Sequence, residues 1–327
     1  MNILIAANGI IPAVKYGGTQ RVIWYLGKEF TKMGHKVTFL VERGSYCDFA
    51  SIIFINHEKS LSEQIPPSTD IVHLNFKPAE PVRKPYVITI HGNCNDFNEF
   101  DNNSIFVSQN HANRFGSNSF VYNGLDWDDY GKPNLINTRN YFHFLGKAAW
   151  KVKNFKGAID IINATPNERL KVLGGYRLSL NMGFRFTISP RIQFYGMVGG
   201  TKKNSLLEGS KGLIFPVRWH EPFGLALIES LYFGCPVFGT PYGSLPEIVN
   251  PEVGFLSNSA EELSKEVENV ERFSRTRCHE YTLETFNSKK MAESYMEKYL
   301  KVLNGEQLNK LPPKLVQKQT KKLLDWK

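Results

Sequence analysis

Short apolar runs alternate with helical stretches along most of this chain of 327 residues, and they do so in two sets. The first set of strand-like runs is Ile3–Ala6, Val37–Val41, Ile71–Leu74, Tyr86–Ile90 and Ile105–Val107. The second set is Tyr141–Leu145, Leu170–Leu173, Ile192–Phe194, Leu213–Phe215 and Val237–Phe238. Strands that alternate with helices are typical of parallel sheets covered by helices. The two sets therefore predict an α/β chain of two similar domains.

A segment rich in Asn, Asp, Gly and Pro separates the two sets, over residues 122–140. This composition is typical of a linker, so we place the domain boundary near residue 139. The expected organisation is an N-terminal domain over 1–139, a C-terminal domain over 140–282, a closing helix over 283–304 and a basic tail over 305–327. A helix from about Gln20 to Met33 is expected to end at Gly34, because glycine suits the position after a helix end.

Two carboxylates, Glu221 and Glu229, lie eight residues apart in an otherwise apolar stretch that is expected to be helical. Pro222 suits the first helical position, which places Glu221 at the mouth of the helix. Eight helical residues span roughly 12 Å, about the reach from the sugar to the ribose of an extended nucleotide-sugar. The amides of Phe223, Gly224 and Leu225 would lie between the carboxylates, at the positive end of the helix dipole, where a pyrophosphate could be held.

The surroundings of Glu229 are apolar on nearly every side, and burying an unpaired charge there would cost free energy. Two ribose hydroxyls would supply charge-assisted hydrogen bonds to this carboxylate. A nearby lysine, or exposure of the carboxylate to water, would stabilise the charge of Glu229 equally well. For two glutamates at this spacing alone, the lysine or water is the simpler explanation, so the flanking residues must decide.

The flanking residues resemble the donor-binding region of the retaining GT-B glycosyltransferases, and most closely that of glycosyltransferase family 4. The matching segments are Pro216, Trp219-His220-Glu221-Pro222-Phe223-Gly224-Leu225, Glu229, Gly234-Cys235-Pro236-Val237 and Gly243-Ser244-Leu245-Pro246-Glu247. Val217 stands where many members have serine. The resemblance implies the GT-B fold, in which two Rossmann-like domains with parallel sheets face each other across a cleft. It also implies that Glu221 contacts the transferred sugar, that Glu229 holds the ribose, and that the closing helix packs back toward the N-terminal domain.

Two glycines, Gly17 and Gly18, follow the first strand and open the first helix, next to Tyr16. A tight turn and a loop that approaches a phosphate both fit such a pair, which is not the G-x-G-x-x-G fingerprint of dehydrogenases. The resemblance implies that this loop faces the diphosphate and the acceptor. His91 ends a strand, where ligands of open α/β sheets bind. The resemblance implies that His91 assists at the reacting face, for which it could donate a hydrogen bond to the leaving group.

A basic loop over residues 146–154 resembles the family's loop in which a cationic pair neutralises the leaving diphosphate. Lys147 and Lys153 are the expected pair, and Lys151 competes for the second place. Positive charge placed where negative charge develops is a large contribution to this kind of catalysis. Three further residues match loops that receive the nucleobase in the family: Gly175, Met197 and Val198.

Metal binding is not expected. Asp126-Trp127-Asp128 has the form of the manganese-binding signature of GT-A glycosyltransferases, but its context resembles the turn near the interdomain linker of family 4, so we interpret it as a turn. The four cysteines show neither metal-ligand nor redox spacing, which favours a reducing cytoplasm. We therefore expect neither an essential metal nor a cofactor.

The net charge is +9, and the tail over residues 305–327 holds six lysines and two acidic residues, a net of 6 − 2 = +4. Leucines and a tryptophan lie among these lysines, so the tail is either a solvated extension or a segment that lies on an anionic membrane at the inner face. No nucleic-acid-binding module is recognised. The N-terminus is interpreted as a first strand, not a signal peptide, and no apolar run has the length of a membrane span. A cytoplasmic location is expected.

The predicted reaction is transfer of a sugar from a nucleotide-sugar donor to an acceptor hydroxyl, with retention of anomeric configuration. The acceptor would be a glycan, a lipid-linked molecule or a small molecule, and the setting surface polysaccharide or glycan biosynthesis. Two alternatives stay open: a non-catalytic nucleotide-sugar or carbohydrate-binding GT-B protein, and a sugar-nucleotide epimerase. An epimerase would release isomerised donor, whereas a transferase needs an acceptor.

Overall fold

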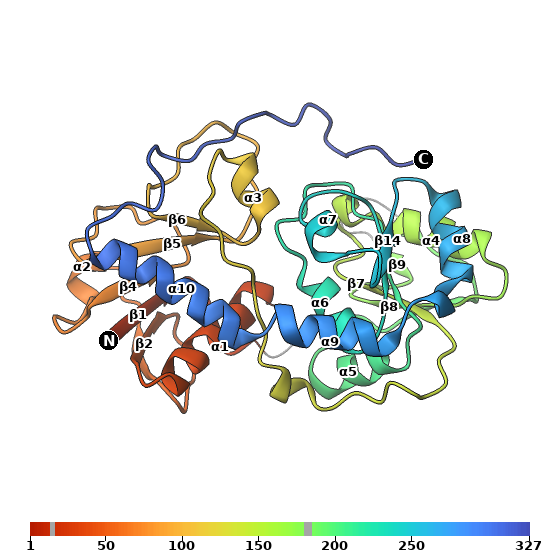
Figure 1. Ribbon diagram of the computed structural model, residues 1–327, viewed down its shortest axis with the longest axis horizontal. Helices are drawn as coiled ribbons and strands as arrows, with labels where there is room; N and C mark the ends of the chain where they lie inside the picture. Colours follow the sequence, from red (N-terminus) through yellow and green to blue (C-terminus); the bar gives the residue numbers. More distant parts are fainter. Residues whose placement is uncertain (14–16, 180–184) are drawn as a thin grey trace. The chain divides into compact units, whose positions relative to one another are not determined.

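The computed structural model in Figure 1 describes residues 1–13, 17–179 and 185–327, so Tyr16 of the glycine-rich loop lies outside the described residues. The chain divides into two compact units. Unit 1 is Met1–Asp126 with Phe286–Lys318, and unit 2 is Trp127–Thr285 with Gln319–Lys327. The first passage between them comes after Asp126, before the expected boundary near residue 139. Residues just past this point already pack in unit 2, where the ring of Trp127 stacks on that of Tyr232 at 4.4 Å between centroids.

Unit 1 is built on a six-stranded parallel sheet with the strand order β3-β2-β1-β4-β5-β6. Its strands are β1 (Asn2–Ala7), β2 (Lys36–Val41), β3 (Ser51–Phe54), β4 (Ile71–Leu74), β5 (Tyr86–Ile90) and β6 (Ser104–Phe106). Its helices are α1 (Gly18–Lys32), α2 (Leu61–Gln64), α3 (Gln109–Arg114) and α10 (Ser288–Leu303). The five runs predicted as strands all lie on this sheet. The edge strand β3 was not predicted, because its four residues are exposed or only half-buried and carry a weak apolar signal.

Unit 2 repeats the same winding, with the strand order β11-β8-β7-β12-β13-β14. The strands of this sheet are β7 (Phe142–Leu145), β8 (Leu170–Leu173), β11 (Ile192–Phe194), β12 (Leu213–Phe215), β13 (Val237–Gly239) and β14 (Gly254–Leu256). Its helices are α4 (Phe155–Ala164), α5 (Gly200–Glu208), α6 (Leu225–Tyr232), α7 (Leu245–Ile248), α8 (Ala260–Glu268) and α9 (Arg275–Thr285). A small antiparallel hairpin, β9 (Leu178–Ser179) and β10 (Arg185–Phe186), interrupts the series. Both sheets have the Rossmann order, which confirms the predicted α/β class and two Rossmann-like domains.

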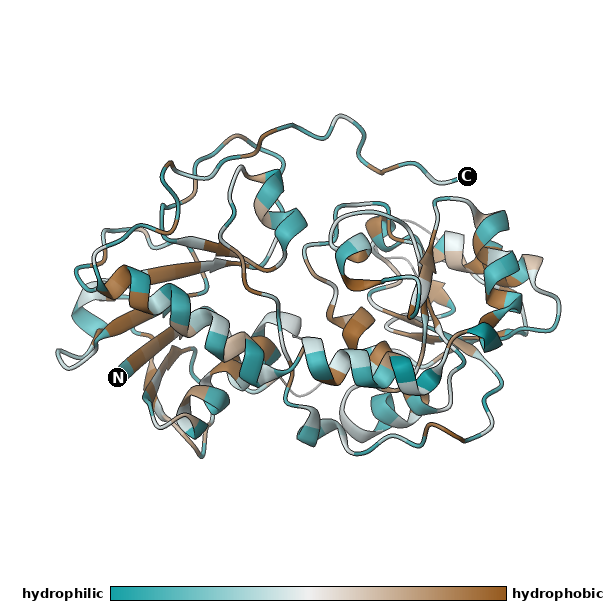
Figure 2. Ribbon diagram, viewed as in Figure 1, coloured by the Kyte–Doolittle hydropathy of each residue, from teal (hydrophilic) through white to brown (hydrophobic). Residues whose placement is uncertain are grey.

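The core of each unit lies on its sheet, whose strands are mostly apolar (Figure 2). Leu4, Val72 and Ile88 belong to one buried cluster on the sheet of unit 1, while Phe144 and Phe238 belong to the core of unit 2. Parallel strands covered on both faces read as continuous apolar runs. This is why the strand runs could be read directly from the sequence.

The expected closing helix over 283–304 is in fact two helices, because α9 ends at Thr285 and α10 begins at Ser288. The side chain of Asn287 caps α10 by accepting a hydrogen bond from the Lys290 amide. Helix α10 packs on α1 and β5 of unit 1. Its buried Tyr299 hydroxyl lies 2.6 Å from Nδ1 of His73 on β4. Burial lowers the pKa of His73 to about 3, so the imidazole is neutral in this contact.

The basic tail is docked on the protein. Residues up to Lys318 belong to unit 1, where Leu315 is 2% exposed and packs with Phe115. The final segment belongs to unit 2, where Trp326 packs against the core and the Lys327 amide donates to the Asn258 carbonyl at 2.8 Å. The tail therefore contacts the protein at Leu315, Trp326 and Lys327, while most of its other residues are exposed. No helix in the described ranges has both the length and the apolar character needed to cross a membrane.

Candidate donor site

Three loops lie together at the carboxyl edge of the sheet in unit 2. The Gly174 amide donates to the Gly196 carbonyl at 2.7 Å, and the Ala148 amide donates to the Gly174 carbonyl at 2.9 Å. A Cβ on Gly174 would lie 2.2 Å from the Gly146 carbonyl oxygen, so these backbones touch. The loops that carry Lys147, Gly175, Met197 and Val198 are thus held side by side after β7, β8 and β11. Ligands of open α/β sheets bind at this edge.

Glu221 lies after β12 at the same carboxyl edge, and its side chain is 8% exposed. Lys153 Nζ lies 2.6 Å from Glu221 Oε2, and the indole nitrogen of Trp219 donates to the same oxygen at 2.9 Å. The lysine ammonium also lies 5.1 Å from the centroid of the Trp219 ring. The structure therefore brings together two residues that the sequence placed in one site. Lys151, the competitor, is exposed, whereas only 11% of the Lys153 side chain is exposed.

The backbone of Glu221 is fixed by the segment Gly243-Ser244. The Ser244 amide donates to the Glu221 carbonyl at 2.9 Å, and the Ser244 hydroxyl donates to the Phe223 carbonyl at 2.7 Å. Gly243 has a φ of 66°, and a Cβ there would lie 2.2 Å from the Glu221 amide nitrogen. Only glycine fits such a close backbone approach in this conformation.

The helix that follows begins later than the sequence predicted. Helix α6 starts at Leu225, with Gly224 as its N-cap at a φ of 86°, so Pro222 lies in the preceding loop. The contacts of Ser244 with residues 221 and 223 hold this stretch as a loop, and they outweigh the local preference of proline for a helix start. The expected geometry of eight helical residues between the glutamates is therefore wrong. Of the three predicted amides, those of Phe223 and Gly224 precede the helix.

Glu229 lies within α6 and is 2% exposed. Its carboxylate forms an ion pair with Lys203 of α5, and Oε1 accepts a hydrogen bond of 2.8 Å from the Tyr130 hydroxyl. These partners meet the cost of burying the charge inside the protein. The lysine alternative is thus the arrangement present, and a ribose contact stays a prediction. Lys203 and Tyr130 were missed because they lie 26 and 99 residues from Glu229 in the chain.

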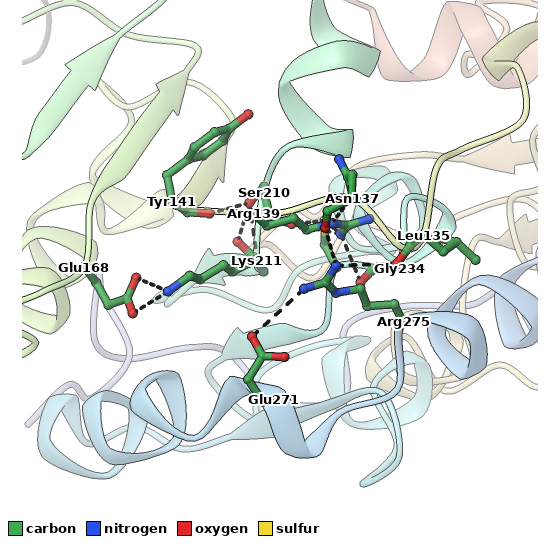
Figure 3. Close-up of polar contacts among 12 residues, drawn as sticks. Leu135, Asn137, Arg139, Tyr141, Glu168, Ser210, Lys211, Gly234, Glu271 and Arg275 are labelled. Carbon is green, nitrogen blue, oxygen red and sulfur yellow. Dashed lines mark hydrogen bonds and ion pairs between the residues drawn. The ribbon is translucent and has the colours of Figure 1, made fainter.

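A buried arginine holds the other end of α6 (Figure 3). Arg139 is 5% exposed, and its guanidinium donates to the carbonyls of Phe233, Ser210 and Gly234 at 2.8, 2.9 and 3.3 Å. A cation is favourable at the carboxyl end of a helix, where carbonyls lack partners. Arg275 donates to the Asn137 carbonyl at 2.8 Å in the same cluster. Arg139 therefore positions the helix that carries Glu229, a role that the sequence did not reveal.

His91 follows β5 at the carboxyl edge of the sheet in unit 1. The side-chain nitrogen of Asn75 donates to the Ala6 carbonyl at 3.1 Å, so its oxygen is the atom that faces His91 Nε2 at 2.8 Å. His91 Nε2 must therefore carry the proton in this hydrogen bond. Burial lowers the pKa of His91 to about 4, so the ring is neutral at pH 7 and Nδ1 holds a lone pair. The structure thus offers an acceptor at Nδ1, where a donor to the leaving group was expected.

Gly17 and Gly18 lie at the start of α1 in unit 1, as the sequence indicated. Gly17 has a φ of 152°, and a Cβ there would lie 2.8 Å from the Ala13 Cβ. The glycine is therefore required by the backbone itself, whether or not a phosphate approaches it.

Asp126 is held by two lysines in unit 1, Lys28 at 2.8 Å and Lys32 at 3.1 Å. Burial raises the pKa of this carboxyl, but the hydrogen bonds and charges of the two lysines outweigh burial and lower it. The carboxylate is thus engaged by α1, and a short 3-10 helix, Trp127–Tyr130, follows it where the sequence predicted a turn. Among the described residues, no group of three or more His, Cys, Asp and Glu side chains is arranged to hold a metal ion.

Comparison with known proteins finds a family match in the second half of the chain. Residues 127–284 match the family model described as "Glycosyl transferases group 1". A curated relative, the N-acetyl-alpha-D-glucosaminyl L-malate synthase of Bacillus anthracis, is 31% identical over 136 residues, which cover 38% of this chain and 34% of the relative. The matched region thus spans about a third of that relative's length.

Solved glycosyltransferases share the fold of the whole chain. AviGT4, a glycosyltransferase involved in avilamycin A biosynthesis, has a TM-score of 0.75 at 18% identity, over 93% of this chain and 98% of that one. A glycosyltransferase from Rickettsia africae has a TM-score of 0.70 at 15% identity, over 93% and 99%. Anabaena HepE, solved with UDP-glucose, has a TM-score of 0.64 at 15% identity, over 91% and 98%. The chain therefore has the GT-B fold, and its residues 127–284 are similar to the glycosyl transferases group 1.

Proposed function

We propose that this chain is a glycosyltransferase that moves a sugar from a nucleotide-sugar to an acceptor hydroxyl with retention of configuration. The observation that carries the proposal is the ion pair of Lys153 with Glu221, which lies at the carboxyl edge of a sheet and inside the region that matches the group 1 family. The curated relative is named as a synthase of N-acetyl-alpha-D-glucosaminyl L-malate, and HepE was solved with UDP-glucose. Surface polysaccharide or glycan biosynthesis is the proposed setting.

Lys153 and Lys147 are proposed to stabilise the diphosphate as it leaves. Cations held near a developing negative charge lower the transition-state energy most where water is excluded, and Lys153 is largely buried. Glu221 holds the Lys153 ammonium in place before the donor binds, and its carboxylate is the proposed acceptor for hydroxyls of the transferred sugar. Lys147 lies 4.9 Å from the centroid of the Trp150 ring, in the loop after β7.

His91 is proposed to orient a substrate hydroxyl by accepting its hydrogen bond at Nδ1. The proton on Nε2 is committed to Asn75, and the low pKa of the ring keeps Nδ1 unprotonated at neutral pH. Asn75→Asp would raise the pKa of His91, because a carboxylate favours the protonated imidazole, and a protonated ring would carry a donor at Nδ1 in place of the acceptor. The proposal thus assigns His91 a positioning role in unit 1.

Binding and turnover with a panel of UDP-, GDP- and ADP-sugars test the proposal. Calorimetry measures binding, and slow donor hydrolysis reports the chemistry before the acceptor is known. We expect Lys153→Met to lower the hydrolysis rate by about 100-fold, the usual effect of removing one stabilising group. Lys151→Met, two residues away and exposed, is the matched control and should stay within about threefold of the unsubstituted protein. Equal effects of the two substitutions would contradict the assignment of Lys153.

The product distinguishes the alternatives. Transfer with the donor's anomeric configuration in the NMR spectrum of the product supports a retaining transferase, and the opposite configuration refutes retention. Isomerised donor without any transferred sugar indicates an epimerase. Tight nucleotide-sugar binding with neither hydrolysis nor transfer indicates a non-catalytic binding protein.

A further inference from the structure

The hairpin of unit 2 exposes four large apolar side chains on one face. Leu178 and Phe186 lie opposite each other in the antiparallel register and are 52% and 54% exposed. Tyr176 and Ile188 continue the same alternation one step further from the hairpin tip and are 64% and 80% exposed, and the Tyr176 ring also lies beside Gly196, where a Cβ would be 3.1 Å from its Cε1. The Thr187 amide donates to the Arg177 carbonyl at 3.1 Å, which extends the register to the residues between them. Side chains two apart on a strand share a face, so all four lie together.

The opposite face of the hairpin is turned to the protein and is polar. Thr187 is 5% exposed, and the guanidinium of Arg177 donates to the carbonyls of Thr187 and Ile192 at 2.6 and 2.9 Å. Arg177 also lies 5.7 Å from the ring centroid of Phe194 on β11. The usual pattern of a half-covered sheet has its apolar face inward and its polar face outward. In the hairpin the polar face is turned inward and the apolar face outward, which indicates that the outer face binds another surface.

The charge around the hairpin has one sign. Between Glu168 and Glu208 the chain carries seven Lys and Arg residues and not one Asp or Glu. Lys203 is neutralised by Glu229. Four cations of this segment form no ion pair with a carboxylate of the described residues: Arg169 just before β8, Lys171 on β8, Arg191 just before β11 and Lys202 on α5. The apolar face is therefore set in a strongly positive segment.

We propose that the outer face of this hairpin, formed by Tyr176, Leu178, Phe186 and Ile188, binds the surface of a membrane rich in anionic lipid. Aromatic and aliphatic side chains insert at the level of the headgroups, and neighbouring cations are attracted by anionic lipid. A protein partner would require an acidic surface to match this charge, and a second copy of the same hairpin would place like charges together. The tail does not fill this role, since Leu315 and Trp326 are used inside the protein.

The proposal stands apart from the proposed function, because lipid binding is measured without donor or acceptor. The experiment is sedimentation of the full-length protein with phosphatidylglycerol–phosphatidylcholine vesicles and with phosphatidylcholine vesicles alone. We expect binding to the first, at least tenfold weaker binding to the second, and further weakening in high salt. The double variant Leu178→Ser/Phe186→Ser should bind the anionic vesicles at least tenfold more weakly.

Matched controls separate the hairpin from general hydrophobicity and charge. Ile136→Ser changes a 95% exposed residue of unit 2 outside the hairpin and should leave binding within twofold. Arg169→Glu/Lys202→Glu should weaken binding more than Lys289→Glu/Lys290→Glu, which makes the same change of charge on α10 in unit 1. Thermal unfolding checks that each variant keeps its fold.

Three results would overturn the proposal. The first is absence of binding by the unsubstituted protein to anionic vesicles. The second is equal loss of binding in the hairpin variant and in Ile136→Ser. The third is a dimer, seen by light scattering on a sizing column, that Leu178→Ser/Phe186→Ser abolishes, because the face would then bind a second copy of the chain.

Discussion

The buried pair of Lys203 and Glu229 allows the structural and functional roles of Glu229 to be separated. Lys203→Met leaves a carboxylate that is 2% exposed without its lysine, while the hydrogen bond from the Tyr130 hydroxyl is kept. Removing one partner of a buried ion pair lowers the free energy of unfolding by about 3–5 kcal/mol. The double variant Lys203→Met/Glu229→Gln removes both charges and keeps an acceptor for Tyr130. It should therefore recover at least about 2 kcal/mol of that loss, a clear coupling between the two sites.

Urea unfolding of the single and double variants measures this coupling. Tyr130→Phe removes a hydrogen bond to a charged acceptor and should lower the free energy of unfolding by about 1.5–3 kcal/mol. Additive effects of the two substitutions, or a loss below about 1 kcal/mol in Lys203→Met, would refute the reasoning that the pair is a buried, mutually dependent unit.

The same double variant then tests whether Glu229 holds a ribose. If it does, nucleotide affinity falls at least tenfold although the fold is kept, because two charge-assisted hydrogen bonds are lost. Lys211→Met/Glu168→Gln is the matched control in the same unit, since Lys211 Nζ contacts the Glu168 carboxylate at 2.7 and 3.0 Å (Figure 3). This control should leave affinity unchanged. Unchanged affinity in both double variants would leave Glu229 with a structural role alone.

Three further predictions follow from single contacts. Gly243→Ala should lower donor affinity, measured by calorimetry, because the new Cβ would lie 2.2 Å from the Glu221 amide nitrogen. Gly131→Ala is the control, since Gly131 also has a positive φ, 72°, but a Cβ there would have no neighbour within 4 Å. Equal effects of the two substitutions on donor affinity would count against the contact. Trp326→Ala should lower the free energy of unfolding by about 2 kcal/mol, somewhat less than a fully buried aromatic, as measured by urea unfolding; no change would show that the docked tail adds no stability. Burial lowers the pKa of His73 from its ordinary value of 6.5 to about 3 in the folded protein, so the unfolded chain binds more protons between these two values. Stability therefore falls on acidification from pH 7 toward pH 3, with a slope approaching about 1.4 kcal/mol per pH unit. His73→Gln should flatten this slope in urea titrations at pH 7, 6 and 5, and an unchanged slope would contradict it.

Most strands could be predicted from the sequence because they carry their own apolar signal, but β14 (Gly254–Leu256) was not predicted. A parallel strand covered on both faces must be apolar throughout, as β4 (Ile71–Leu74) and β8 (Leu170–Leu173) are. Edge strands are less covered, so β3 carried too little apolar signal to be found. The start of α6 was misplaced for a different reason. Ser244 holds the backbone at Phe223, 21 residues away, and at Glu221, and local preference does not include such contacts.

The partners of buried polar side chains could not be predicted from the sequence, because the fold decides which residues from distant parts of the chain come into contact. Two separate motifs, the one around Glu221 and the basic loop over residues 146–154, predicted Glu221 and Lys153 as members of one site, and the structure pairs them. The lysine that pairs with Glu229 and the asparagine that fixes the tautomer of His91 come from other elements, and nothing in their local sequence marks them. The hairpin adds a third case. Alternation of period two over residues 176–178 and 186–188 indicates that the hairpin has two different faces. The face that packs on the protein is set by the hydrogen bonds of Arg177 to the carbonyls of Thr187 and Ile192, which the sequence does not reveal. These bonds turn the polar face inward and leave the apolar face exposed.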